Sequence, residues 1–251
     1  MQAVIHPQDR SFNYGDGIFT TIQVRDGKLM LWELHLQRLQ FGASRLGFGD
    51  IDWPQLQFQA EAAISSAQQV VKVLISRGEG GRGYACQGID SPRVYISSSA
   101  LPDYSGLQRN GLILRTASLQ LAVQPMLAGL KHNNRLEQVL LKQELAQSDA
   151  DELLVLDQLG YVTEATAANI FFYKDNQWHS PTLSRAGVNG VMRQHIMQQI
   201  NVTEVDWKHN VLSSVEAMFI CNALMGIVPI RQFECQTLSL LPVQQLQQVV
   251  C

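Results

Sequence analysis

Two residues of this sequence, Lys131 and Glu164, have types and surroundings suited to covalent and electrostatic chemistry. Lys131 stands in LAGLKHNNRLEQVLL, where apolar residues lead up to it just before a predicted helix. An apolar approach favours the neutral amine, which is the form that makes a Schiff base with a carbonyl. A solvated lysine at a helix start is the commoner reading of such a position, because desolvated lysines are rare.

Glu164 lies in GYVTEATAANIFF, between β-favouring residues, so its side chain is expected to project from a strand. A buried carboxylate at this position would need a cationic partner, and a protonated pyridine nitrogen could supply one. A single glutamate on a strand is more often solvated, so both readings stay open for Glu164 alone.

A possible phosphate site follows in AGVNGVMRQ, residues 186–194, where a glycine leads directly into a predicted helix. Free backbone N–H groups and the helix dipole at such a start favour a phosphate. A plain helix entry explains the segment equally well.

The segment Gly78–Gly83 matches the G-x-G-x-x-G pattern. The residues after it, from Tyr84 onward, predict a turn and a further strand instead of a helix. Dinucleotide binding needs that helix, so a glycine-rich hairpin loop is the better interpretation. Arg77 and Arg82 lie on or beside this loop, and their forked guanidinium groups suit carboxylates.

Other common sites are missing from the sequence. It has no phosphate-loop lysine motif, no G-x-S-x-G elbow and no pair of histidines at metal-binding spacing, so no metal site is expected. Three histidines, His35, His132 and His195, are interpreted as surface or packing residues. The cysteines Cys86, Cys221, Cys235 and Cys251 are scattered and are expected to be reduced.

Composition limits the class of protein. The 251 residues are 46% hydrophobic and 16% charged with a net charge of −3, which favours a globular chain and disfavours nucleic acid or an anionic membrane as partner. The amino terminus lacks a basic segment followed by an apolar run, and no stretch reaches membrane-spanning length. A soluble, cytoplasmic protein is expected.

The residues that could do chemistry must be positioned by a mixture of strands and helices. Residues 18–31 predict a hairpin about Asp26-Gly27, and an apolar stripe predicts a helix ending near Gly47. Asp52 can cap a second helix. Further strands are predicted at 70–76, 94–98, 112–119, 152–156, 161–164, 170–173, 218–221 and 227–230, with helices at 133–147 and after Gly190.

The turn-rich segment LPDYSG predicts a linker near residues 102–108. We therefore expect an α+β chain of two domains: a smaller N-terminal α+β domain over residues 1–104, and a larger C-terminal α/β domain over 109–251 that carries Lys131.

Seven segments, in order, resemble the fold-type-IV pyridoxal-phosphate enzymes, the group of the branched-chain and D-amino-acid aminotransferases and aminodeoxychorismate lyase. They are FNYGDGIFTT, HLQRL, SRGEGGRGY, LAGLKHNNRLEQVLL, GYVTEATAANIFF, AGVNGVMRQ and ICNALMGIVPI. The resemblance covers nearly the whole chain and implies the two-domain D-amino-acid aminotransferase-like fold, with pyridoxal 5'-phosphate at the domain interface.

The resemblance also implies roles for individual residues. Lys131 holds the cofactor as a Schiff base and acts as the base, and Glu164 binds the pyridine nitrogen. The phosphate is held by residues that match the family's phosphate-binding segments: Arg38, Val191, Met192, Asn222 and Ala223. The aminotransferases carry a Ser/Thr-type phosphate contact where this chain has Asn222-Ala223.

Within the family, the run Lys131–Gln138 resembles the lyase branch. It implies conversion of 4-amino-4-deoxychorismate to para-aminobenzoate and pyruvate, a step of folate biosynthesis, in a homodimer. Because that substrate has two carboxylates, substrate contacts are expected from Arg82, Arg77 and Tyr84. The alternatives are a D-amino-acid or branched-chain aminotransferase of the same fold, and a non-catalytic protein that keeps the fold.

Overall fold

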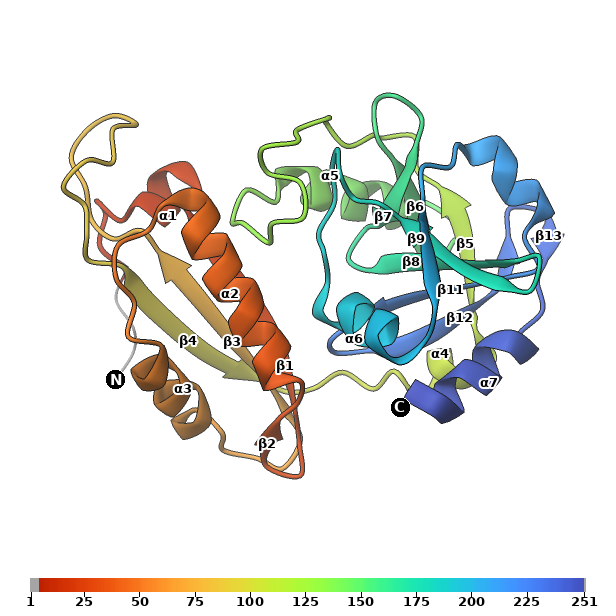
Figure 1. Cartoon of the computed structure of the whole chain (residues 1–251), viewed down its shortest axis with the longest axis horizontal. Helices are drawn as coiled ribbons and strands as arrows, with labels where there is room; N and C mark the ends of the chain where they lie inside the picture. The colour runs from red at the N-terminus through yellow and green to blue at the C-terminus, as the bar shows by residue number, and fades with distance from the viewer. Residues whose placement is uncertain (1–4, 251) are drawn as a thin grey trace. The chain divides into compact units, whose positions relative to one another are not determined.

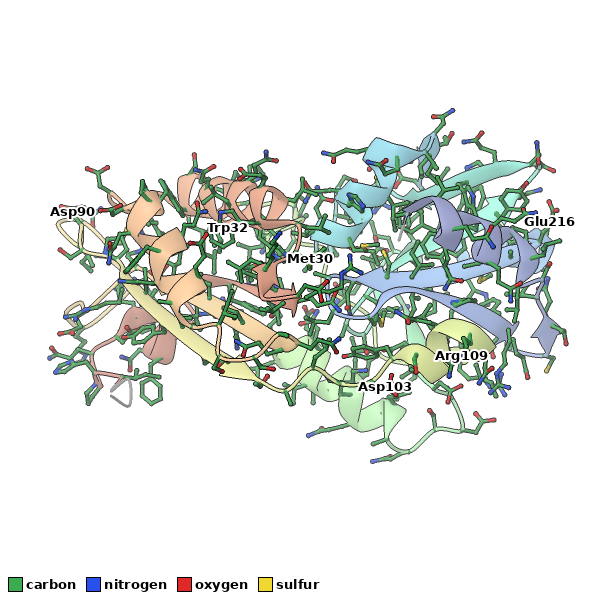
Figure 2. All side chains as sticks on the ribbon, turned by 90° about the horizontal axis from the view of Figure 1, so that it is seen from below. Met30, Trp32, Asp90, Asp103, Arg109 and Glu216 are labelled. Carbon is green, nitrogen blue, oxygen red and sulfur yellow. The ribbon has the colours of Figure 1, made fainter. Side chains whose placement is uncertain are left out.

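The computed structural model describes residues 5–250 and divides the chain into two compact units (Figure 1). The first unit comprises the residues up to Pro102 together with Leu130–Arg135, and the second comprises Asp103–Gly129 and the chain from Leu136 onward. Asp103, labelled in Figure 2, is thus the first residue of the second unit. This division falls at the start of the linker predicted near residues 102–108.

A four-stranded antiparallel sheet in the order β2-β1-β3-β4 forms the first unit, with helices packed on it. Its elements are α1 (Arg10–Tyr14), β1 (Gly17–Arg25), β2 (Lys28–Leu29), α2 (Trp32–Leu46), α3 (Trp53–Ala62), β3 (Gln69–Ser76) and β4 (Arg93–Ser99). One core joins Ile22 and Val73 of the sheet to Leu39 of α2 and Leu56 of α3, so both helices cover one face of the sheet.

Local signals explain these elements, and the predicted hairpin and both predicted helices are confirmed. Asp26 and Gly27 both have positive φ, of 51° and 70°, as a tight hairpin turn requires. The helix α2 ends at Gly47, whose φ is 62° and whose N–H bonds to Ala43 and Ser44 carbonyls. The Asp52 side chain accepts from Gln55 N and caps α3.

The second unit is built on a nine-stranded sheet in the order β10-β9-β8-β11-β12-β5-β6-β7, with β13 paired to β12. Its elements are α4 (Ser105–Asn110), β5 (Leu112–Thr116), α5 (Leu136–Leu145), β6 (Glu152–Leu156), β7 (Val162–Ala165), β8 (Asn169–Lys174), β9 (Gln177–Pro181), α6 (Val191–Gln199), β10 (Val202–Val205), the 3-10 helix η1 (His209–Ser214), β11 (Ala217–Asn222), β12 (Gly226–Phe233), β13 (Gln236–Thr237) and α7 (Leu241–Val250). One core cluster contains Val162 of β7, Phe172 of β8 and Leu114 of β5, so the sheet curls around its own apolar face.

The structure corrects the expectation that the larger C-terminal unit carries Lys131. The backbone of residues 130–135 joins β1 of the first unit: Phe19 N donates to Lys131 O at 3.0 Å, and Asn133 N donates to Gly17 O at 2.9 Å. These bonds group Lys131 with the first unit although the chain on either side of the segment belongs to the second.

The same bonds shorten a predicted helix. The helix predicted for residues 133–147 begins only at Leu136, because Asn133 and Asn134 bond to residues near β1 instead of starting a turn. Asn133 Nδ2 donates to Ser11 Oγ, and Asn134 Nδ2 donates to Gly15 O at 3.2 Å. The strand predicted at 112–119 likewise ends early, at Thr116.

Candidate active site

Lys131 lies beside an aromatic ring in the first unit. Its Nζ stands 4.5 Å from the centroid of the Phe19 ring, and its side chain is half-buried. Phe19 also fixes the backbone here through the bond from its N–H to Lys131 O. Strand β1 thus contacts Lys131 twice, through a hydrogen bond to its main chain and through the Phe19 ring beside its side-chain amine.

Arg38, on α2, carries a guanidinium whose surroundings lack a counter-charge. Its Nη2 donates to Thr20 Oγ1, while its Nε is buried and has no hydrogen-bond partner. Within residues 5–250, no carboxylate forms an ion pair with Arg38. Burial lowers the pKa of Arg38 to about 9. A half-buried cation with a buried, unused Nε donor is a fitting partner for a phosphate.

His35 and Thr20 hold this guanidinium in place. Thr20 Oγ1 lies 2.6 Å from His35 Nδ1, and Arg38 Nη2 lies 3.5 Å from the same nitrogen. Burial, and then the charges of Arg38 and Lys131, keep the pKa of His35 well below its usual range. His35 is therefore neutral at pH 7. Arginine can only donate, so the Thr20 oxygen accepts from Arg38. The Thr20 hydroxyl proton is then available for donation to His35 Nδ1.

Glu164 is a buried residue of β7 in the second unit, so the solvated alternative is wrong. Its Oε2 accepts from Val188 N at 2.9 Å. Gly187 brings the chain across Glu164 with a φ of 84°, and a Cβ there would lie 2.8 Å from Thr163 Cγ2. Only glycine therefore allows this close passage, which leaves a fixed carboxylate beside a turn of main chain.

The turn continues into the N-terminus of α6. Gly190 is the N-cap residue and makes no side-chain capping hydrogen bond, so the first N–H groups of the helix receive no cap. Val191 and Met192, both predicted phosphate contacts, are the first two helical residues and are buried. Their backbone N–H groups suit an anion.

Asn222 serves a turn between β11 and β12. Its Oδ1 accepts from Leu224 N and Met225 N, both at 2.9 Å, and its Nδ2 donates to Ala167 O at 3.1 Å. The Asn222 side chain is thus committed to the protein itself. A phosphate contact from this turn would come from main chain or from Ala223.

The glycine-rich loop after β3 runs to β4 without a helix, which confirms the interpretation as a loop and excludes the dinucleotide fold. Arg10 ties this loop down by donating to the carbonyls of Gly83, Tyr84 and Ala85 at 3.0–3.2 Å. Arg82 is exposed and makes no ion pair within the part of the chain that is described, and Tyr84 is 85% exposed. The loop is anchored through its main chain while both side chains remain available.

Arg77 differs from Arg82, and the structure argues against its predicted substrate contact. Its Nε pairs with Asp16 at 2.7 Å, and its two Nη atoms donate to the Gly47 and Leu46 carbonyls, both at 2.7 Å. Arg77 is buried and all three nitrogens are used, two of them to hold the end of α2 and one to pair with Asp16. We therefore leave Arg77 out of the proposed substrate site.

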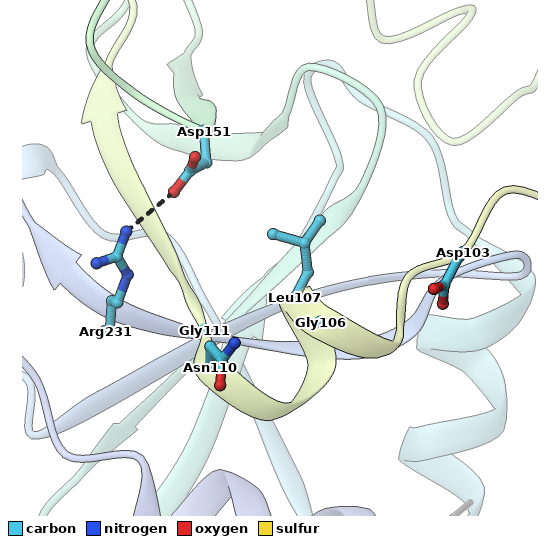
Figure 3. A pocket seen from close by; sticks show the side chains of 7 residues that line it. All are labelled: Asp103, Gly106, Leu107, Asn110, Gly111, Asp151 and Arg231. Carbon is cyan, nitrogen blue, oxygen red and sulfur yellow. Dashed lines mark ion pairs between the residues drawn. The ribbon is translucent and has the colours of Figure 1, made fainter.

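The second unit contains a pocket, drawn in Figure 3. It lies around α4 and includes Arg231 and Asp151, whose side chains approach to 3.5 Å. None of the predicted site residues lines this pocket.

The remaining expectations concern metals, membranes and thiols. Within residues 5–250 there is no group of three or more side chains arranged for a metal ion, and no helix is long and apolar enough to cross a membrane. Cys86, Cys221 and Cys235 form no disulfide among the described residues, and Cys251 lies outside them.

Sequence reasoning missed three residues that contact the candidate segments: Thr20 and His35 beside Arg38 in the first unit, and Asn169 beside the turn before α6 in the second. Thr20 occupies a buried position in the alternation of β1, where a polar residue signals a hydrogen-bond partner. His35 precedes Arg38 by three residues, which places both on one face of α2. Asn169, buried at the start of β8, gave no comparable signal.

Comparisons with known proteins identify the family of this chain. The model of the family "Amino-transferase class IV" matches residues 17–233. The aminodeoxychorismate lyase of Vibrio harveyi is 36% identical over 229 residues, which cover 88% of this chain and 84% of that protein.

Solved structures share the fold. The structure of 4-amino-4-deoxychorismate lyase from Pseudomonas aeruginosa superposes with a TM-score of 0.92 and 35% identity, covering 99% of this chain and 94% of that one. The branched-chain amino acid aminotransferase of Escherichia coli has the same fold, with a TM-score of 0.88 at 20% identity, covering 98% and 88%. The predicted α+β architecture of fold type IV is confirmed, and the chain belongs to the class IV amino-transferase family.

Proposed function

We propose that this protein is a pyridoxal-phosphate-dependent lyase that converts 4-amino-4-deoxychorismate to para-aminobenzoate and pyruvate, a step of folate biosynthesis. The observation that carries the reaction is the 36% identity to an aminodeoxychorismate lyase over 88% of the chain. The E. coli aminotransferase, at 20% identity, is a more distant relative.

The residues present fit the cofactor. The buried Arg38 Nε without a partner and the uncapped start of α6 both suit a phosphate, and we propose that Arg38, Val191, Met192 and the Asn222-Ala223 turn bind it. Glu164, fixed by Val188 N, is proposed to bind the pyridine nitrogen and keep it protonated. Lys131 supplies the amine that holds the cofactor covalently.

When bound, pyridoxal phosphate supplies an electron sink for the charge left on carbon after a proton is removed. The Lys131 amine, free while the substrate is bound, would take the proton from the ring carbon that bears the substrate's amine. The Glu164 carboxylate would stabilise the developing charge by keeping the pyridine nitrogen protonated. The ring C–O bond to the enolpyruvyl group would then break with its electron pair going to oxygen, and the ring would become aromatic. The released enolpyruvate would take up a proton, which Lys131 can return, and become pyruvate.

Arg82 and Tyr84 are proposed to contact the substrate. Arg82 is exposed on an anchored loop and has no ion-pair partner in the described chain, so its guanidinium can bind one of the two substrate carboxylates. By the family resemblance this loop serves the site of a neighbouring subunit. We accordingly propose that the protein is a homodimer. We also propose that it acts in the cytoplasm.

Incubation of the purified protein with 4-amino-4-deoxychorismate tests the function. We expect para-aminobenzoate fluorescence to rise together with an equal amount of pyruvate. An aminotransferase would instead convert the cofactor to its amino form in a half-reaction with D-alanine or leucine, without pyruvate from the chorismate derivative. That pattern would replace our proposal with the aminotransferase.

A further inference from the structure

Asn169 is a buried amide that the proposed chemistry does not use. It opens β8, next to the turn that leads from Gly187 into α6, and only 5% of it is exposed. Its Nδ2 donates to Val188 O at 2.8 Å, and its Oδ1 accepts from Gly190 N at 3.1 Å. One side chain therefore binds the turn at two main-chain positions, one on each side of Asn189.

The fit between this amide and the turn is close. A Cβ on residue 190 would overlap Asn169 Oδ1, so Gly190 is required for the amide to reach the main chain. From elsewhere in the unit, Gly129 N donates to Gly187 O at 2.9 Å and Asn189 N donates to Gly129 O at 3.1 Å. The turn is thus held by Asn169 and by the main chain of Gly129.

Two proposed cofactor contacts depend on this one turn. Val188, whose carbonyl binds Asn169, gives its N–H to Glu164 Oε2. Gly190, whose N–H binds Asn169, is the N-cap residue of α6. A shift of residues 188–190 would therefore move the carboxylate proposed for the pyridine nitrogen and also the N–H groups proposed for the phosphate.

We infer that Asn169 is a positioning residue for the cofactor, acting at its pyridine end through Val188 and Glu164 and at its phosphate end through Gly190 and α6. This inference rests on the proposed function in so far as Glu164 and the α6 N-terminus bind pyridoxal phosphate. Asn169 itself makes no cofactor contact. Its effect comes from the two hydrogen bonds that fix the turn.

The test is a titration of the apoenzyme with pyridoxal phosphate, followed by the absorption of the bound cofactor and its dependence on pH. We expect Asn169→Ala to weaken binding about 10- to 100-fold, because two hydrogen bonds that order the site are lost. We also expect the pH dependence of the absorption to shift, because Glu164 loses its fixed position.

Asn169→Asp is the second variant, for the case in which the alanine variant does not fold. Its carboxylate still accepts from Gly190 N but opposes the Val188 carbonyl and places a negative charge near the proposed phosphate site. We expect it to bind the cofactor at least 10-fold more weakly than the wild type. Wild-type affinity in this variant would overturn the inference.

Gln69→Ala is the matched control, since Gln69 is also a buried amide that fixes a loop. Its Oε1 accepts from Ser65 N at 3.1 Å and its Nε2 donates to Ala63 O at 2.9 Å, in the first unit. It should lose stability and keep cofactor affinity. If Asn169→Ala behaves in the same way, Asn169 is only structural. If the wild type takes up no pyridoxal phosphate, the proposed function fails as well.

Discussion

Replacing Arg38 by methionine should make the apoprotein more stable while it weakens cofactor binding. Arg38 is a cation with a buried Nε and no carboxylate partner in residues 5–250, and burial lowers its pKa to about 9. Relative to an ordinary arginine, this shift corresponds to an unfavourable free energy on the order of 5 kcal/mol. Water that enters the site of the apoprotein reduces this figure, so we expect a gain of about 1–4 kcal/mol from the apolar side chain.

The sign of the pH dependence follows from the lowered pKa. The unfolded chain binds the Arg38 proton more tightly than the folded chain does, so the penalty is fully present at neutral pH and declines as the pH rises above about 9. Thermal unfolding of apo Arg38→Met at pH 7 should show a Tm about 3–15 °C above that of the wild type. Its pyridoxal-phosphate Kd should rise at least about 100-fold, because charge-assisted hydrogen bonds to phosphate are lost.

Arg77→Met provides the contrast, because Arg77 pairs with Asp16 and donates to two carbonyls. This variant should lose stability by about 3–5 kcal/mol, since the two carbonyls lose their donors and Asp16 keeps only its ion pair with Arg10. An apo Arg38→Met that is less stable than the wild type, with cofactor affinity unchanged, would refute the role assigned to Arg38.

Three further predictions concern the chemistry. Lys131→Ala should lose the visible absorption of the covalently held cofactor and all turnover, whereas Lys142→Ala, which removes only an ion pair with Glu152, should keep both; the reverse pattern would show that Lys131 is not the anchor. Glu164→Gln should bind the cofactor but react with a barrier raised by about 3 kcal/mol or more, measured as kcat, and an unchanged kcat would contradict its role. Arg82→Ala should lower kcat/KM for 4-amino-4-deoxychorismate by about 10- to 150-fold without changing cofactor affinity, and Arg82→Lys should recover only part of that loss; wild-type kinetics in Arg82→Ala would mean that the arginine is merely exposed.

Most of the strands and the main helices could be predicted because their signals are local. The alternation in β1, the Asp26-Gly27 turn and the Asp52 cap each depend on a few neighbouring residues. Helix α7 and the short elements β9 and β10 were not predicted, although α7 buries Val243 and Leu246. The strands β9 and β10 are short, and tertiary packing determines them, whereas the apolar residues of α7 do recur at helical spacing and were overlooked.

The candidate site was predictable only in part. Lys131 and Glu164 were selected through the family resemblance, because either residue alone reads as an ordinary surface residue. The sequence could not distinguish Arg77 from Arg82, since both lie on or beside the same glycine-rich loop. Only the fold shows that Arg77 pairs with Asp16 and donates to two carbonyls. The roles of Thr20 and Asn169 depend on contacts between separate elements, which local sequence does not encode.

The return of residues 130–135 to β1 has a consequence for how the chain is made. The first unit is complete only when this segment pairs with Phe19 and Gly17. During synthesis on the ribosome, the first unit therefore cannot finish folding until residue 135 has emerged. By then residues 103–129, which belong to the other unit, have already been synthesised. A truncated product ending at Pro102 would lack both the candidate lysine and the main chain that pairs with the start of β1. Neither unit corresponds to a contiguous piece of the gene. Recombination at the linker would therefore separate the segment that carries Lys131 from β1, the strand that positions it.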